Sequence, residues 1–315
     1  MRSILCILLV FILAFPCFAA AENADAATPE TVQTADAALV SNPLPVDFTG
    51  GCPPMAEGYG EGWVYEDPTL RVSIEYKHND KYIKGYSGYD MGYWVVDVRV
   101  GHASQLRTAA AESFSTTTTL PVESIAGRVN AVVAVNGDYF ARHRDGFAVR
   151  QGNLIQNKLK GNRDLLLIDE DGDFHVYHMP EKGELSDTVD GKKVTNAFFF
   201  GPILVEDGEA RQNLPSFDFL KPDKYTARLA ICQIGPLHYK LIVTTMEQDY
   251  TLGMRLKDFA QLCQEEGAQT AYNLDGGLST TLFFNGQRLN EQNRVNFRNI
   301  PDIVYFASAW SGEEQ

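Results

Sequence analysis

Short apolar runs, separated by polar turns that contain glycine, dominate the chain after the first 45 residues. Residues 93–100 are rich in aromatic and β-branched side chains, which favour a β-strand. Residues 131–135 and 241–245 are short continuous apolar runs, typical of strands that are buried on both faces. The pattern therefore predicts a fold built mainly from short strands.

Two segments predict helices. Residues 121–129 predict a short helix with Thr119 as its cap, and residues 255–266 predict a longer helix that ends before Gly267. Residues 270–274 predict the strand that follows. Mixed strands with two helices predict the α+β class, and no change of composition divides the folded part into two domains.

An acidic turn, Asp169-Glu170-Asp171-Gly172, separates the apolar residues 165–168 from residues 174–177, which predicts a β-hairpin. An acidic run of this kind also occurs in calcium-binding loops, but the distal bidentate glutamate of such loops is missing here. His175 and His178 would face opposite sides of a strand, which is poor geometry for sharing a metal ion. We therefore expect neither a metal ion nor another cofactor.

The N-terminus predicts export from the cytoplasm. Arg2 precedes an apolar run over residues 4–15, and small residues follow at Ala19 and Ala21, which is the layout of a secretory signal peptide. The apolar run is shorter than the roughly 20 residues that span a bilayer, so a cleaved signal over residues 1–21 is favoured over a retained membrane anchor. We expect a secreted or cell-envelope protein without a membrane span after cleavage.

Residues 22–45 carry little apolar surface, so they predict a flexible linker, and residues 46–315 remain as the folded domain. Beyond the signal the cysteines are Cys52, Cys232 and Cys263. An odd number at wide spacing fits neither a disulfide framework nor a zinc site, although one bridge is permitted in an exported protein.

The formal net charge of the chain is −14. Proteins that bind nucleic acid neutralise its phosphates with lysine and arginine, so this charge argues against a nucleic-acid partner and against adhesion to an anionic membrane. A small phosphate-bearing substrate remains compatible with it, provided that a few cations gather in one cleft.

Polar residues directly follow two of the predicted strands, residues 131–135 and residues 270–274. Strand ends are common places for functional sites, because the sheet holds the loop rigidly. In the second group paired glycines would turn backbone N–H groups towards an anion. Each group alone is also typical of an ordinary turn. The candidates are Asn136, Gly137 and Asp138 in the first group, and Asp275, Gly276, Gly277, Ser279 and Thr280 in the second.

Two further positions are candidates for substrate binding. Gly201-Pro202 precedes a predicted strand and indicates a bend at the wall of a site, although a simple hairpin that turns at Asp207-Gly208 is the alternative. Arg228 stands at the head of an apolar run, where its guanidinium would hold a phosphate or carboxylate in a bidentate manner. A surface salt bridge is the alternative for Arg228.

Taken together and in this order, these elements resemble the phosphodiester glycosidase family over residues 94–306. Leu278 stands where that family has a third glycine, and a glycine pair usual in the family is missing near Phe147. The segments that carry the resemblance are residues 135–140, 147–157, 201–204, Arg228, residues 251–256 and, most specifically, Asn273-Leu274-Asp275-Gly276-Gly277.

The resemblance implies a hydrolase that releases an N-acetylglucosamine-like sugar from a sugar-1-phosphodiester in envelope or extracellular glycans. It implies that Asp275 and Asp138 are catalytic, and that Arg228, with the N–H groups of the glycine loop, holds the phosphate. Asn136 and Thr280 would orient hydroxyl groups.

Two alternatives remain open from the residues alone. One is a metal-dependent phosphodiesterase, against which the absence of histidine–carboxylate clusters in the sequence counts. The other is a non-catalytic glycan-binding protein of the envelope. Leu278 leaves this second alternative open, because a leucine adopts a positive φ only at a cost and would alter a loop that needs a glycine there.

Overall fold

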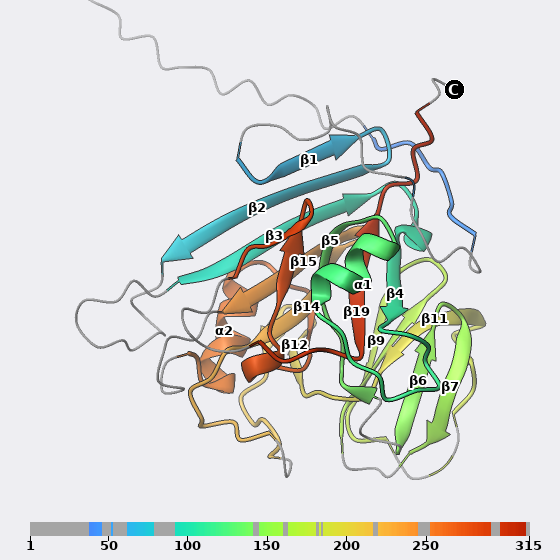
Figure 1. Cartoon of the computed structure of the whole chain (residues 1–315). Helices are drawn as coiled ribbons and strands as arrows, with labels where there is room; N and C mark the ends of the chain where they lie inside the picture. Colours follow the sequence, from blue (N-terminus) through green and yellow to red (C-terminus); the bar gives the residue numbers. More distant parts are fainter. Residues whose placement is uncertain are drawn as a thin grey trace, which may run out of the picture. The chain divides into compact units, whose positions relative to one another are not determined.

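The computed structural model describes residues 38–45, 52, 62–78, 92–140, 145–159, 163–180, 183, 185–216, 220–244, 253–290 and 297–312. The predicted signal peptide, residues 1–21, and most of the predicted linker, residues 22–45, lie outside these ranges, so export remains a prediction. Within them the chain forms three β-sheets and two α-helices (Figure 1). Neither helix is long and apolar enough to cross a membrane.

The largest sheet has eight antiparallel strands. Two long neighbours, β2 and β3, pair along their whole lengths, and β3 then pairs with β15 from much later in the sequence. Helix α2 (Leu256–Glu265) packs against β12 and β13. The order across the sheet is β1 (Val64–Asp67), β2 (Leu70–His78), β3 (Gly92–Val100), β15 (His238–Thr244), β14 (Leu229–Gly235), β16 (Thr270–Asn273), β12 (Ile203–Glu206) and β13 (Glu209–Ala210).

Two smaller antiparallel sheets complete the fold. Helix α1 (Val122–Arg128) packs on β5 and β19 of the five-stranded sheet. That sheet has the order β18 (Gln287–Arg288), β17 (Leu282–Phe284), β5 (Ala131–Asn136), β19 (Asp302–Ala307) and β4 (Leu106–Ala110). The other sheet has the order β7 (Asn153–Lys158), β6 (Gly146–Arg150), β11 (Lys192–Phe198), β8 (Leu165–Asp169) and β9 (Phe174–Tyr177), with β10 (Thr188–Val189) paired to β11.

The largest hydrophobic cluster draws on all three sheets. Val96 and Ile231 come from the eight-stranded sheet, Phe198 from the sheet of β11, and Val133 and Phe306 from the five-stranded sheet. All five side chains are buried. Because the same core fixes the three sheets against one another, the loops at their ends are held in defined positions.

Most of the predicted elements are confirmed. The runs at 93–100 and 131–135 lie in β3 and β5, residues 241–244 of the run at 241–245 lie in β15 while residue 245 lies outside the described ranges, and the acidic turn joins β8 to β9 as a hairpin. Both predicted helices are present, but Thr119 is not a cap: α1 begins after Pro121, without a side-chain cap bond. The α+β class is roughly right, with strands predominating.

The three cysteines beyond the predicted signal are free thiols. Cys232 on β14 and Cys263 on α2 are buried in the same hydrophobic cluster. Burial raises the pKa of the Cys263 thiol, and the neighbouring Cys232 adds to the effect.

Candidate active site

Asn136 joins the ends of two strands that are far apart in the sequence. β5 ends at Asn136, and its side-chain amide donates to the carbonyl oxygen of Asp275 at 2.8 Å. The same side chain accepts a hydrogen bond from the N–H of Thr281 at 3.1 Å. The N–H of Asp275 in turn donates to the carbonyl of Gly137 at 3.3 Å. The structure therefore brings together the two polar groups that follow the predicted strands.

Asp138 and Asp302 share one buried arginine. Nη2 of Arg150 lies 2.6 Å from Oδ1 of Asp138 and 3.2 Å from Oδ2 of Asp302. Asp138 also accepts hydrogen bonds from the N–H groups of Phe140 and Phe199, at 3.1 and 3.0 Å. The exposed fractions of the Asp138 and Asp302 side chains are 2% and 0%. Both carboxylates therefore lie inside the fold. The catalytic role of Asp138 remains a prediction.

One guanidinium faces two carboxylates in this cluster, so full ionisation leaves an excess of negative charge. Burial raises the pKa of Asp302, and the nearby Asp138 acts in the same direction. Oδ1 of Asp302 has no hydrogen-bond partner in the described ranges. A Cβ at position 137 would overlap the Asp302 carboxylate, so only glycine fits there.

Sequence reasoning missed Arg150 and Asp302. Each is a charged residue at the end of an otherwise apolar strand, Arg150 at the end of β6 and Asp302 at the start of β19. A charged residue at the end of an apolar strand is expected to be buried, and a buried charge needs a partner of opposite charge. This is the only signal for the two residues that the sequence pattern contains. The identity of the partner, 152 positions away, is not visible in the pattern.

Asp275 is the carboxylate of this group that reaches the surface. It is half-buried, whereas Asp138 and Asp302 are buried. Burial raises its pKa to about 6, against the opposing effects of a hydrogen bond from the Ser279 hydroxyl and of the positive charge of Arg298. Its Oδ1 also accepts the N–H of Gly276 at 2.9 Å. A carboxylate with this pKa is ionised at neutral pH and still takes a proton readily.

Arg298 supplies an exposed cation beside Asp275. Its Nη1 donates to the Ser279 hydroxyl oxygen at 3.3 Å, and its backbone N–H donates to the carbonyl of Leu278 at 3.1 Å. The sequence pattern gave no signal for this residue, because Arg298 lies in an irregular segment before β19. An exposed guanidinium beside a hydroxyl is suited to binding a phosphate.

The glycine loop differs from its predicted role. The N–H groups that we expected to face an anion donate within the protein: Gly276 to Asp275, Gly277 to the carbonyl of Ala227, and Ser279 to the carbonyl of Gly276. A Cβ at Gly276 would lie 2.7 Å from the Ala227 oxygen, so the loop packs closely on the segment that precedes β14. The contact of Gly276 and Gly277 with substrate remains a prediction.

Leu278 does not distort this loop. The positive φ of the turn, +60°, falls on Gly277, and Leu278 is not among the residues with positive φ. Leu278 instead lies in the short 3₁₀ turn Gly277–Ser279. The backbone therefore accommodates the residue that stands in place of the family's third glycine.

The model of one protein family, described as phosphodiester glycosidase, matches residues 129–307 of the chain. This match covers β5, β6, β16 and β19, which carry or flank the residues of the site. The chain belongs to the phosphodiester glycosidase family. It is therefore a phosphodiester glycosidase-type hydrolase, the class of enzyme that acts on phosphodiester-linked sugars. A search of curated protein sequences found no significant match.

Two solved structures share the fold. One is the zebrafish N-acetylglucosamine-1-phosphodiester alpha-N-acetylglucosaminidase catalytic domain, auto-inhibited by its pro-peptide, with a TM-score of 0.60 and 20% identity over 82% of this chain and 87% of that chain. The other is a hypothetical protein from Synechocystis, with a TM-score of 0.53 and 18% identity over 75% of this chain and 62% of that chain. At these identities the likeness shows the fold alone.

Arg228, one of the positions that carry the resemblance to the family, is 3% exposed. Its Nε donates to the carbonyl of Met254 at 3.0 Å, and its Nη2 donates to the carbonyls of Lys221 and Lys224 at 3.3 and 2.8 Å. Burial lowers its pKa to about 10. These bonds brace the backbone around the glycine loop, and a contact with phosphate remains a prediction.

The Gly201-Pro202 element lies against the strand that delivers Asp275. The side-chain amide of Asn273 donates to the carbonyl of Gly201 at 2.8 Å, and its backbone N–H donates to the carbonyl of Pro202 at 3.0 Å. The Gly201-Pro202 element therefore lies next to β16, and its place at the wall of a substrate site remains a prediction. The hairpin at Asp207-Gly208 is present as well, between β12 and β13.

Unpartnered polar atoms gather around the site. Six buried side-chain polar atoms lack a hydrogen-bond partner in the part of the chain that the structure describes, and four of them belong to Asn273, Thr280, Thr281 and Asp302. Buried polar atoms normally find partners in the protein or in water. These four therefore mark the place where water or a polar ligand is needed. The described residues contain no group of three metal-binding side chains, and metal dependence is tested below.

Proposed function

We propose that the protein is an exported enzyme that hydrolyses the bond between a sugar and phosphate in a sugar-1-phosphodiester of envelope or extracellular glycans, with N-acetylglucosamine as the released sugar. The observation that carries the proposal is the environment of the Asp275 carboxylate. Asp275 is a half-buried carboxylate with a raised pKa, and it lies between a buried carboxylate cluster and an exposed arginine.

Asp275 acts as the general base in this mechanism. It takes a proton from a water molecule whose oxygen bonds to the anomeric carbon, while the bond from that carbon to the phosphate oxygen breaks. The bonding electrons leave with the phosphate, which is already a good leaving group. The negative charge of Asp138 and Asp302, only partly balanced by Arg150, stabilises the positive charge that develops on the sugar.

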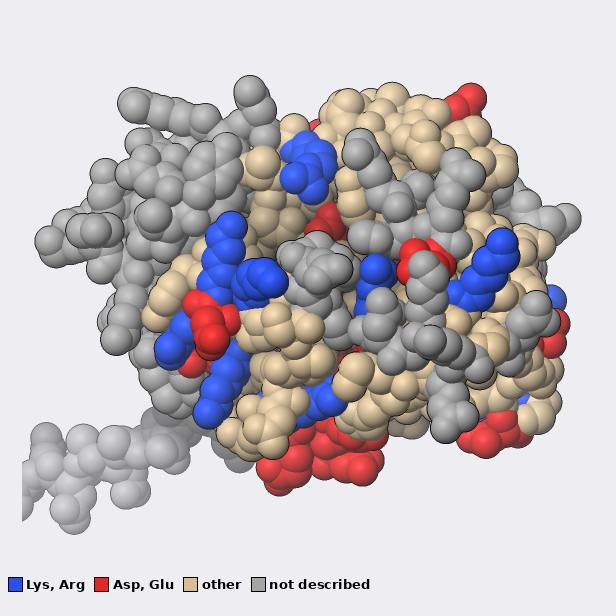
Figure 2. Space-filling model, turned by 90° about the horizontal axis from the view of Figure 1, so that it is seen from below, with Lys and Arg blue, Asp and Glu red and all other residues tan. Residues whose placement is uncertain are grey.

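Arg298 and Ser279 hold the departing phosphate. Arg298 is exposed, and its guanidinium already donates to the Ser279 hydroxyl. The face in Figure 2 carries scattered lysine and arginine side chains, while acidic side chains gather at its lower edge. Cations are therefore present on this face despite the net charge of −14.

The rate of hydrolysis should fall on the acid side of pH 6. A general base works only when ionised, and burial raises the pKa of Asp275 to about 6. Below that pH we expect kcat/KM to drop about tenfold per pH unit. A pH profile of kcat/KM between pH 4.5 and 8 measures this, and a flat profile would contradict the assignment of Asp275 as base.

Replacing Arg298 by alanine should lower kcat/KM by about 10²-fold, the usual loss for one charge-stabilising donor. The charge of Arg298 lowers the pKa of Asp275, so its loss should also move the acid limb to higher pH. The matched control is Arg71→Ala, which removes an exposed ion pair with Glu66 on β1 and β2. Unchanged kinetics and an unchanged pH profile in Arg298→Ala would exclude this role.

The activity itself is tested with the purified protein, UDP-N-acetylglucosamine and a panel of sugar-1-phosphodiesters. Release of free sugar is followed with and without EDTA. We expect release that EDTA does not affect. Release that requires a metal ion would favour a metal-dependent phosphodiesterase. Saturable binding without release across the panel would favour a glycan-binding protein.

A further inference from the structure

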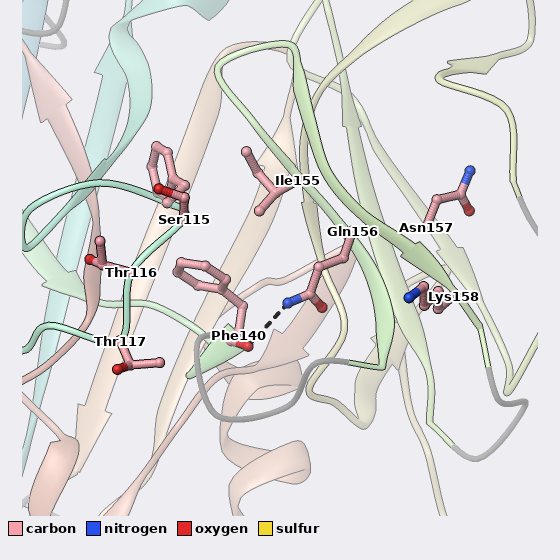
Figure 3. A pocket seen from close by; sticks show the side chains of 9 residues that line it. Ser115, Thr116, Thr117, Phe140, Ile155, Gln156, Asn157 and Lys158 are labelled. Carbon is pink, nitrogen blue, oxygen red and sulfur yellow. Dashed lines mark hydrogen bonds between the residues drawn. The ribbon is translucent and has the colours of Figure 1, made fainter.

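The candidate site does not involve two buried cysteines, Cys232 on β14 and Cys263 on α2. Both side chains are fully buried in the hydrophobic cluster between α2 and the eight-stranded sheet. Neither lines the pocket of about 320 Å³ in Figure 3, whose walls include Phe140 and residues 155–158. That pocket adjoins the carboxylate cluster, because the Phe140 ring centroid lies 5.1 Å from Cζ of Arg150. The cysteines are therefore a separate feature of the fold.

The alternation of side chains along β14 directs Cys232 towards α2. Leu229 and Ile231 belong to the largest hydrophobic cluster, whereas Ala230 and Cys232 belong to the cluster that contains α2. Cys263 lies on the buried face of α2 and belongs to the same cluster. The two cysteines therefore meet one interface from opposite sides, one from the sheet and one from the helix.

Small side chains allow the helix and the sheet to approach closely at this point. Ala271 on β16 lies directly across from Cys232, and Ala260 precedes Cys263 by about one turn of α2. The side chains of Cys232 and Cys263 are hydrogen-bonded to each other. After the helix the N–H of Gln269 donates, at 2.9 Å, to the carbonyl of the residue that follows Cys232. The backbone thus also holds the two cysteines near each other.

We propose that Cys232 and Cys263 form a disulfide bond when the protein folds in an oxidising compartment. The proposal rests on the predicted export and is independent of the catalytic mechanism. Disulfides form and persist in the compartments to which exported proteins are sent. Cys52 keeps its thiol: it lies outside the cluster of the other two, and its N–H donates to the carbonyl of Ser308, after β19, at 3.0 Å.

The bond forms by thiol–disulfide exchange with an oxidant that itself contains a disulfide, such as oxidised glutathione. The thiolate of one cysteine attacks a sulfur atom of the oxidant and releases a thiol, and the second cysteine then attacks the mixed disulfide and releases the other thiol. The cysteines lose two electrons and two protons in all, and the oxidant is reduced to two thiols. Because both cysteines are fully buried in the folded protein, the exchange takes place before α2 packs on the sheet.

The bond would fasten α2 across the strand that delivers Asp275. β16 lies between β14 and β12 in the sheet, and α2 packs on β12 and β13. Cys263 reaches β14 on the other side of β16 through its contact with Cys232. A cross-link between these positions also restricts the unfolded chain, which stabilises the folded state. The stability of the oxidised protein should therefore depend on reductant.

A map of the cysteines tests the proposal. The wild-type protein is secreted by an expression host through a secretion signal of the host, so the result does not depend on the chain's own N-terminus. It is then denatured and treated with iodoacetamide without reductant. We expect the label on Cys52 alone, with the peptides of Cys232 and Cys263 joined and lighter by two hydrogen atoms than the reduced pair. Label on all three cysteines, or a bridge that contains Cys52, would overturn the proposal.

Thermal unfolding separates the bond from the packing of the two side chains. Dithiothreitol should lower the Tm of the secreted wild-type protein by about 5 °C or more, and it should leave the Tm of Cys263→Ala unchanged. Cys232→Ala takes the place of that variant if Cys263→Ala does not fold. Cys52→Ala is the matched control and should keep the full response to dithiothreitol. A wild-type Tm that does not respond, or an equal response in the cluster variant, would contradict a disulfide at this position.

Discussion

Asp275→Asn should reduce kcat by about 10³-fold while leaving the fold intact, because the amide cannot take the proton of the attacking water. The asparagine oxygen can still accept the N–H of Gly276, so the loop keeps its internal hydrogen bond. Steady-state kinetics on a sugar-1-phosphodiester measures the loss, and thermal unfolding checks the fold.

The matched control is Asp97→Asn, at a half-buried aspartate on β3 that pairs with His238. It should hydrolyse the same substrate at the wild-type rate. Wild-type turnover by a folded Asp275→Asn protein would show that another group is the base. Asp138 would then be the next candidate, as the resemblance to the family implies.

Arg150→Met should lower the free energy of unfolding by about 3–5 kcal/mol, because it leaves two buried carboxylates without their cation. The loss should be smaller at pH 5 than at pH 8. Burial already raises the folded-state pKa of Asp302, and without the arginine this pKa rises further, so the folded protein takes up a proton as the pH falls and is stabilised by it. Denaturant unfolding at the two pH values measures both effects.

Arg71→Met serves as the control, since the Arg71–Glu66 pair is exposed and its removal should cost about 1 kcal/mol or less. Equal losses in the two variants would contradict the view that Arg150 neutralises a buried cluster. A loss for Arg150→Met that does not depend on pH would contradict the proposed ionisation of the two carboxylates.

A site with three carboxylates must still admit an anionic substrate, and the arrangement of charges indicates how. Asp138 and Asp302 are buried and share Arg150, so their charge acts over a short range inside the fold. The exposed edge, where the phosphate would lie, carries Arg298, whose guanidinium donates to the buried Ser279 hydroxyl next to Asp275. In the proposed mechanism negative charge would face the sugar, and positive charge would face the phosphate.

Much of the fold follows from local patterns in the sequence. Continuous apolar runs such as residues 131–135 become buried strands, and the acidic turn after residue 168 becomes a hairpin. The cap of α1 was predicted wrongly, because Thr119 has the side chain of a cap but the cap position is Pro121, two residues later, and the helix begins at Val122. Strand order is not a local property, since β3 pairs with β15 across the chain.

In the candidate site, too, features that depend on local sequence were predicted, and features that depend on tertiary contacts were not. Asn136 and Asp275 were visible as candidates because each follows a clear strand, and the structure brings them into contact. The internal hydrogen bonds of the glycine loop could not be predicted from the sequence, because they depend on which segment the fold places beside it: the N–H of Gly277 donates to the carbonyl of Ala227. Arg150, Asp302 and Arg298 were missed because their partners depend on which strands the tertiary fold places side by side.

The measurement that tests the central claim most directly is hydrolysis of a sugar-1-phosphodiester in water labelled with oxygen-18. Water that attacks the anomeric carbon, with Asp275 as base, leaves the label in the hydroxyl group of the released sugar and none in the phosphate. The account predicts this distribution, with the rate reduced in Asp275→Asn. Label found in the phosphate would show cleavage of the phosphorus–oxygen bond and would contradict a glycosidase mechanism.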